Sequence, residues 1–195
     1  MKKFELSNAI AALSRGDVIV YPTDTLYALG ANIYNEDAVK KVFKIKRRPR
    51  NLPFPIAVSN FKEMEKIAYT NDLVKTVVEQ LLPGELTVLL FKKDKVSNAI
   101  TTGSNKVAVR IPGNDIALDL LSKFGPLTVT SANIHRQKTP YVINDITMQF
   151  SKDIQVYLDY GKLDGKPSTI VDLTSKDLVI VRQGSITKKE ILDAI

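Results

Sequence analysis

The sequence predicts a mixed α/β fold in which helices flank a twisted sheet of parallel and antiparallel strands. Short β-branched runs, such as 18–21 and 106–111, alternate irregularly with helical segments. The runs 169–173 and 178–182 have the spacing of a hairpin, which adds antiparallel pairing to the sheet. We find no internal repeat, low-complexity tract or linker, so we expect one domain over residues 1–195.

The N-terminal half begins with a helix that we expect Ser7 to cap and Gly16 to end. A buried strand at 18–21 then stops at Pro22, which has no N–H for a sheet. Asn35 caps a second helix with an apolar face. The other elements expected in this half are a strand at 56–58, a short helix after Asn60, a helix at 72–82 and a strand at 87–91.

The C-terminal half contains more short strands than the first half. We expect strands at 106–111, 127–129, 156–158, 169–173 and 178–182, and helices at 115–124 and 141–152. Thr187 and Glu190 have the spacing of a capping box for a last short helix. The segment 131–133 is expected in a loop at a strand end.

Basic residues are concentrated at the end of the second helix. The chain has a net charge of +7, and residues 40–50 contain no acidic side chain. The basic residues in this run are Lys40, Lys41, Lys44, Lys46, Arg47, Arg48 and Arg50. Such a run favours an anionic partner. The alternatives are a generally basic surface and cations that stabilise the helix C-terminus by about 0.3–1 kcal/mol each.

The composition excludes several classes of site. The chain has no cysteine and a single histidine, His135, so disulfides, thiolate zinc sites and cysteine nucleophiles are excluded and a Ser-His-Asp triad is unfavoured. No apolar run approaches 18 residues and no leader follows Met1, so we expect a cytoplasmic protein with no membrane partner. No glycine-rich phosphate motif is present, so a bound nucleotide would be held by side chains.

Several predicted strands end in polar residues, where open α/β sheets bind ligands. These residues are Thr23–Thr25, Arg110, Ser131–Asn133, Ser168 and Arg182. Together with Lys46 and Arg48 they predict a site for phosphates and a carboxylate. In the alternative interpretation the threonine, serine and asparagine residues form local turns and the arginines lie on edge strands.

Seven motifs in order resemble the YrdC-like family of threonylcarbamoyl-AMP synthases. They are Val20–Tyr27, Lys46–Pro49, Pro83–Thr87, Val107–Pro112, Thr130–Asn133, Pro167–Asp172 and Val181–Gly184. Each motif is short, but the ordered set covers residues 18–185 and is highly specific. The resemblance implies a YrdC-like fold with a concave basic face. It implies a nucleotidyltransferase that joins L-threonine, bicarbonate and ATP into threonylcarbamoyl-AMP and pyrophosphate.

The resemblance also implies roles for individual residues. The implied ATP contacts are Lys46, Arg48, Ser131, Asn133 and Arg182, with Lys106 and Thr139 as further candidates. The implied threonine contacts are Thr25, Arg110 and Ser168, with the carboxylate on Arg110. The nucleophile would come from the substrates, so no catalytic acid, base or nucleophile is expected from the protein. Mg²⁺ would arrive with ATP and need no protein side chain.

The implied product serves a downstream complex that transfers threonylcarbamoyl to adenosine in tRNA, and weak tRNA or double-stranded RNA binding is a further expectation. The sequence departs from the family pattern at Ala28, Leu52, Ala57, Asn114 and His135-Arg136, which bears on the threonine pocket. Two alternatives stay open: a YciO-like paralogue, in which the S-x-N element is usually lost, and an RNA-binding module without this activity.

Overall fold

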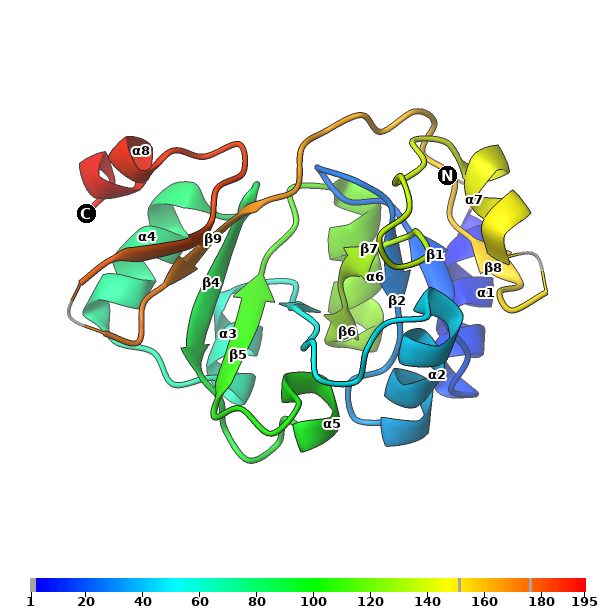
Figure 1. Cartoon of the computed structure of the whole chain (residues 1–195), viewed down its shortest axis with the longest axis horizontal. Coiled ribbons are helices and arrows are strands. Elements are labelled where there is room, and N and C mark those ends of the chain that lie inside the picture. The colour runs from blue at the N-terminus through cyan, green and yellow to red at the C-terminus, as the bar shows by residue number, and fades with distance from the viewer. Residues whose placement is uncertain (1–2, 151, 176) are drawn as a thin grey trace.

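The computed structural model describes residues 3–150, 152–175 and 177–195 and confirms a mixed α/β fold (Figure 1). The helices are α1 (Lys3–Ser14), α2 (Glu36–Lys46), α3 (Phe61–Ile67), α4 (Asp72–Leu81), α5 (Asn98–Thr101), α6 (Asp115–Phe124), α7 (Ile143–Phe150) and α8 (Lys188–Asp193). The strands are β1 (Ile19–Tyr21), β2 (Ala28–Gly30), β3 (Ile56–Ala57), β4 (Leu86–Phe91), β5 (Lys106–Arg110), β6 (Leu127–Thr128), β7 (Thr130–Ser131), β8 (Val156–Tyr157), β9 (Thr169–Asp172) and β10 (Val179–Arg182).

The strands form two mixed sheets where the sequence suggested one. The first has four strands in the order β7-β2-β1-β8, and the second has six in the order β10-β9-β4-β5-β3-β6. A bridge between Asn32 and Leu127 joins them. Figure 1 shows the two sheets side by side, with α3, α4 and α8 beside the larger sheet and α1, α2 and α7 beside the smaller one. The expected hairpin is present, because β9 and β10 pair antiparallel.

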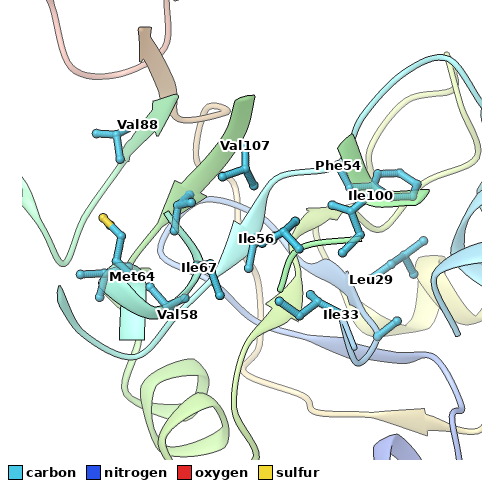
Figure 2. Close-up of a cluster of buried hydrophobic side chains, with 14 of the residues drawn as sticks. Leu29, Ile33, Phe54, Ile56, Val58, Met64, Ile67, Val88, Ile100 and Val107 are labelled. Carbon is cyan, nitrogen blue, oxygen red and sulfur yellow. The ribbon is translucent and has the colours of Figure 1, made fainter. Parts of the chain in front are cut away.

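Buried apolar side chains of both sheets hold these layers together. One cluster joins Leu29 and Ile33 of the smaller sheet region to Ile56 and Val88 of the larger sheet (Figure 2). A second cluster lies between α1, α6 and β1, where Leu13, Ile19 and Leu120 are fully buried. The shared core fixes the relative position of the strand ends that approach each other between the sheets.

Several local signals determine the helix boundaries as predicted. Gly16 has φ +79°, and its N–H and that of Asp17 close the end of α1 on carbonyls of the last turn. The Asn35 side chain accepts from the N–H groups of Asp37 and Ala38, and the Thr187–Glu190 capping box is present.

Four sequence-based expectations were wrong or incomplete. Ser7 lies inside α1, whose described part begins at Lys3, so Ser7 does not cap it. The strands β2 and β7 and the short helix α5 were missed, and Ser131, which was expected in a loop, pairs with β2. These elements span two to four residues, too few for a hydrophobic period to be visible.

Candidate functional site

A cleft of about 480 Å³ opens between the two sheets. The predicted site residues that line it are Thr25, Arg48, Lys106, Arg110, Ser131, Thr139, Ser168 and Arg182. They come from segments far apart in the sequence, and the two-sheet arrangement brings them together. Lys46 and Asn133 are not among the lining side chains, because both are buried beside Ser131.

Arg110, at the end of β5, forms the innermost charge of the cleft. It is only 4% exposed. Its guanidinium donates from Nη1 to Thr25 Oγ1 at 3.1 Å, and from Nη2 to Asp24 Oδ1 at 2.5 Å and to the Gly84 carbonyl at 3.0 Å. Burial lowers the pKa of Arg110, and the Asp24 carboxylate opposes that shift. Asp24 is therefore the counter-ion that allows a buried cation at this position.

Thr23 and Thr25 form part of a local turn, as the alternative interpretation predicted. Thr23 Oγ1 accepts from the Thr25 and Leu26 N–H groups and lies 2.6 Å from the Leu26 carbonyl oxygen. The two hydroxyl oxygens are 3.0 Å apart. The turn does not exclude a binding role, because it places Thr25 in the cleft beside Arg110.

On the larger sheet, Arg182 and Ser168 form the opposite pair. Arg182 donates from Nε and Nη2 to the Ser168 carbonyl at 3.1 and 2.7 Å, and from Nη2 to Ser168 Oγ at 3.3 Å. Ser168 Oγ lies 2.8 Å from Thr87 Oγ1 of β4. Burial, and then the charge of Arg110, lower the pKa of Arg182. Arg182 thus brings a second positive charge to the cleft near the first.

Gly184 makes this arrangement sterically possible. A Cβ at this position would lie 2.2 Å from the Pro167 carbonyl oxygen and 2.4 Å from the Thr169 nitrogen. Only a residue without a side chain lets the chain after β10 approach so closely. The close approach keeps Arg182 against Ser168.

Arg48 lies where α2 has ended and the chain enters the loop before β3. Its Nε donates to the Leu52 carbonyl at 3.0 Å, and its Nη2 donates to the Pro53 carbonyl at 3.1 Å. The guanidinium lies 5.2 Å from the Phe54 ring centroid, within cation–π range. Burial lowers the pKa of Arg48. These contacts hold its charge at the wall of the cleft, and Arg48 forms no ion pair with a carboxylate of the described residues.

Lys46 points inward from the last turn of α2 and is 2% exposed. Its Nζ contacts the Ser131 and Asn133 carbonyls at 2.6 and 3.0 Å, Asn133 Oδ1 at 2.7 Å and Ser131 Oγ at 3.3 Å. Burial and nearby Arg48 lower the pKa of Lys46 to about 7, while the oxygen acceptors favour the ammonium form. Lys46 therefore fixes the position of the segment whose residue Ser131 lines the cleft.

Asn133 completes this contact. Its Oδ1 also accepts from Ser131 Oγ at 2.7 Å, and its Nδ2 donates to the Ile134 and Gln137 carbonyls. Among the two further candidates, Lys106 forms a 2.8 Å ion pair with Asp172, and Thr139 lines the cleft.

The departures from the family pattern occupy different positions. Ala28 lines the cleft on β2, and the Leu52 carbonyl accepts from Arg48. Asn114 caps α6 by accepting from the Ala117 N–H, and Ala57 is buried in the cluster under α6. The substitutions at these last two positions therefore have local structural roles in this chain.

Three residues at the site have roles that the sequence did not predict. Asp24 was among the polar residues predicted at strand ends, but its pairing with Arg110 was not predicted, and Thr87 was predicted only as part of a motif, because their partners Arg110 and Ser168 lie more than 80 positions away. Thr101 lines the cleft with a buried Oγ1 that has no hydrogen-bond partner among the described residues. No local pattern marks any of these long-range contacts.

Within residues 3–150, 152–175 and 177–195, no group of three or more His, Cys, Asp or Glu side chains is placed to hold a metal ion. In the same part of the chain, no helix has the length and apolar character needed to cross a membrane.

Comparison with known families places the cleft in a wider context. A family model named Sua5_yciO_yrdC, described as "Telomere recombination", matches residues 11–184. A putative threonylcarbamoyl-AMP synthase of Methanocaldococcus jannaschii is 38% identical over 88% of this chain and 81% of its own length. The threonylcarbamoyl-AMP synthase of Pyrococcus abyssi is 32% identical over 98% of this chain, which spans only 57% of that protein.

Solved structures agree with these matches. The crystal structure of P. abyssi Sua5 complexed with L-threonine has a TM-score of 0.96 and 32% identity, covering 100% of this chain and 58% of its own. The crystal structure of Escherichia coli YciO has a TM-score of 0.90 and 26% identity, covering 97% of this chain and 94% of its own.

Proposed function

Because the chain belongs to the Sua5/YciO/YrdC family, we propose that it is a threonylcarbamoyl-AMP synthase. It is a nucleotidyltransferase that uses L-threonine, bicarbonate and ATP. Its products are threonylcarbamoyl-AMP, pyrophosphate and water. The relatives named as synthases and the threonine complex of the P. abyssi protein support this assignment.

One observation carries the proposal: a single cleft contains three arginines beside serine and threonine hydroxyls. The arginines are Arg48, Arg110 and Arg182, and the hydroxyls include Thr25, Ser131 and Ser168. Guanidinium groups bind phosphates and carboxylates through paired hydrogen bonds, and short hydroxyls orient polar ligand groups. An amino acid and a nucleotide together supply the anions that such a cleft would bind.

We assign the nucleotide to Lys46, Arg48, Ser131, Asn133, Arg182, Lys106 and Thr139, and the threonine to Thr25, Arg110 and Ser168. Arg48 and Ser131 face the cleft directly. The Lys46 ammonium already donates to oxygen acceptors of the protein, so it binds a phosphate by exchanging one of these acceptors for a phosphate oxygen. Arg110 takes the carboxylate of threonine, beside the Thr25 hydroxyl.

The proposed chemistry needs no protein nucleophile. The threonine amine attacks bicarbonate carbon, and loss of water gives a carbamate. A carbamate oxygen then attacks the α-phosphorus of ATP, the bond from that phosphorus to the bridging oxygen breaks, and pyrophosphate leaves with the electron pair. The protein aligns the reactants, which contributes about 7–11 kcal/mol in well-oriented reactions. The arginines stabilise charge that develops on the phosphates.

The remaining partners follow from this assignment. Mg²⁺ neutralises phosphate charge and is held mainly by the nucleotide, since the polar side chains that line the cleft are cations and hydroxyls. The product passes to a complex that transfers threonylcarbamoyl to tRNA. Weak tRNA or double-stranded RNA binding involves the exposed basic residues near Arg47, and the protein works in the cytoplasm.

The test is the formation of pyrophosphate and an AMP adduct from ATP, L-threonine and bicarbonate. We expect turnover to require all three, and Arg48→Ala and Lys46→Ala to lower it about 10- to 100-fold, as loss of a charge-assisted hydrogen bond does. Lys44→Ala is the matched control, because Lys44 is exposed on the same helix. A wild-type protein without turnover, or variants with the wild-type rate, would contradict the proposal.

A YciO-like activity is the second candidate, because E. coli YciO has the same fold over 94% of its length. Ser131, which lines the cleft, and Asn133, which is buried beside it, are both present and bonded to Lys46, which favours the synthase. An RNA-binding module would bind RNA with a steep salt dependence and no response to ATP. Binding assays with and without ATP distinguish these outcomes.

A further inference from the structure

Four of the hydroxyl groups that line the cleft form two pairs, each next to one arginine. The Oγ1 atoms of Thr23 and Thr25 are 3.0 Å apart beside Arg110, and Thr87 Oγ1 and Ser168 Oγ are 2.8 Å apart beside Arg182. A hydroxyl has one proton to donate, whereas an arginine can only donate. The acceptors available to each hydroxyl proton therefore determine which hydroxyl can donate to a ligand and which can accept from it.

In the first pair, the proton of Thr23 is already used. Thr23 Oγ1 lies 2.6 Å from the Leu26 carbonyl oxygen, which can only accept. Both lone pairs of Thr23 Oγ1 are also occupied, because it accepts from the Thr25 and Leu26 N–H groups. Thr25 Oγ1 accepts from Arg110 Nη1 and keeps a second lone pair and its own proton, so its hydroxyl can meet the ligand as an acceptor or as a donor.

In the second pair the contacts favour one direction of the hydrogen bond. Ser168 Oγ accepts from Arg182 Nη2 at 3.3 Å. Among the hydrogen bonds of the described residues, Thr87 Oγ1 has no acceptor except Ser168, and Thr87 is 1% exposed. If Ser168 donated to Thr87, the Thr87 proton would be buried without an acceptor, which is costly. Thr87 therefore donates to Ser168, whose own proton is left for the cleft.

From this count we propose that Thr87 is a positioning residue that makes the Ser168 hydroxyl a hydrogen-bond donor to the amino-acid substrate. The inference rests on the proposed function and deepens it. An amino acid then has one favoured orientation. Its amine donates to Thr25 beside its carboxylate on Arg110, and an oxygen of its side chain or carboxylate accepts from Ser168.

Calorimetric titration of L-threonine and of L-2-aminobutyrate, which lacks the side-chain hydroxyl, tests this inference without turnover. We expect Thr87→Val to weaken L-threonine binding about 5- to 10-fold, the effect of one neutral hydrogen bond. Thr87→Ser keeps the donor and should restore wild-type affinity. Thr128→Val is the matched control, because its buried hydroxyl bonds to the Leu29 carbonyl away from the cleft lining. The ATP affinity should be the same in all four proteins.

The outcomes distinguish the positioning role of Thr87 from the proposed synthase activity. Unchanged L-threonine affinity in Thr87→Val, failure of Thr87→Ser to restore it, or an equal loss of ATP affinity would overturn the positioning role. A larger loss for L-threonine than for L-2-aminobutyrate would place the Ser168 proton on the side-chain hydroxyl, and an equal loss would place it on the carboxylate. A wild-type protein that binds L-threonine with these variant effects but makes no adduct would contradict the synthase assignment alone. A wild-type protein that binds neither amino acid would overturn both.

Discussion

Arg110 and Arg182 reach the same cleft but hold their charges in different ways. Arg110 is buried and ion-paired to Asp24, whereas Arg182 is much more exposed to solvent and donates to the carbonyl and hydroxyl of Ser168. Among the ion pairs of the described residues, none includes Arg182. A buried charge requires an oppositely charged partner within the protein, whereas an exposed charge is solvated by water until a ligand anion binds. The cleft thus combines a fixed cation with a cation whose charge is available.

The largest expected effect comes from removing the partner of the fixed cation. Asp24→Ala leaves the Arg110 guanidinium buried without its carboxylate, which costs about 3–5 kcal/mol. Chemical denaturation measures the free energy of unfolding. Asp119→Ala is the matched control, because Asp119 pairs with Lys123 at the surface, where a pair contributes about 0–1 kcal/mol. Equal effects of the two variants would remove the distinction between the two arginines.

The second prediction tests how Arg182 is held. Gly184→Ala places a Cβ against the Pro167 carbonyl, so the backbone must shift, at a cost of about 1–3 kcal/mol for an overpacked site. Because Arg182 then loses its position on Ser168, L-threonine binding should weaken as well. Ser185→Ala, one residue further on, is the control. Wild-type affinity in Gly184→Ala would mean that Ser168 does not depend on the Arg182 contact.

The contrast between the two arginines marks the limit of what the sequence could predict. Element types followed from local patterns, and the motifs around Arg110, Ser131 and Ser168 were placed in one cleft as expected. The pairing of Asp24 with Arg110 was missed, because a local turn explains Asp24 equally well and its partner is 86 positions away. The direction of a hydroxyl proton likewise depends on neighbours from another strand.

The sequence predicted the position of Lys46 but not its environment. The position of Lys46 at the end of α2 was expected, but its burial was not, since a basic run usually lies in solvent. The turn that brings Ser131 and Asn133 to Lys46 forms through β7, a strand too short to be recognised. Lys46 therefore differs from both Arg110 and Arg182, because it is a buried cation whose hydrogen-bond acceptors are all uncharged.

The third prediction uses this third cation. The pKa of Lys46 is lowered from 10.5 to about 7 in the folded protein, so above pH 7 the unfolded chain binds the proton and the folded chain does not. The free energy of unfolding of the wild type, relative to Lys46→Met, should therefore rise with pH from about 7, by at most about 1.4 kcal/mol per unit. Denaturation at several pH values measures it, with exposed Lys44→Met as control. A flat difference would mean that the oxygen acceptors keep Lys46 charged.

The smallest expected effect separates Arg47 from its neighbours in the basic run. Arg47 caps α2 with φ +51°, in the left-handed region that favours glycine, and its side chain is exposed. Arg47→Gly removes the steric cost of that conformation and should stabilise the protein by about 0.5–1 kcal/mol. ATP affinity should stay the same, because the Arg47 side chain does not line the cleft. Arg50→Gly is the control, since the backbone φ angle of Arg50 is not positive. If Arg47→Gly instead weakened ATP binding as Arg48→Ala does, the whole basic run, and not its two inward members, would belong to the site.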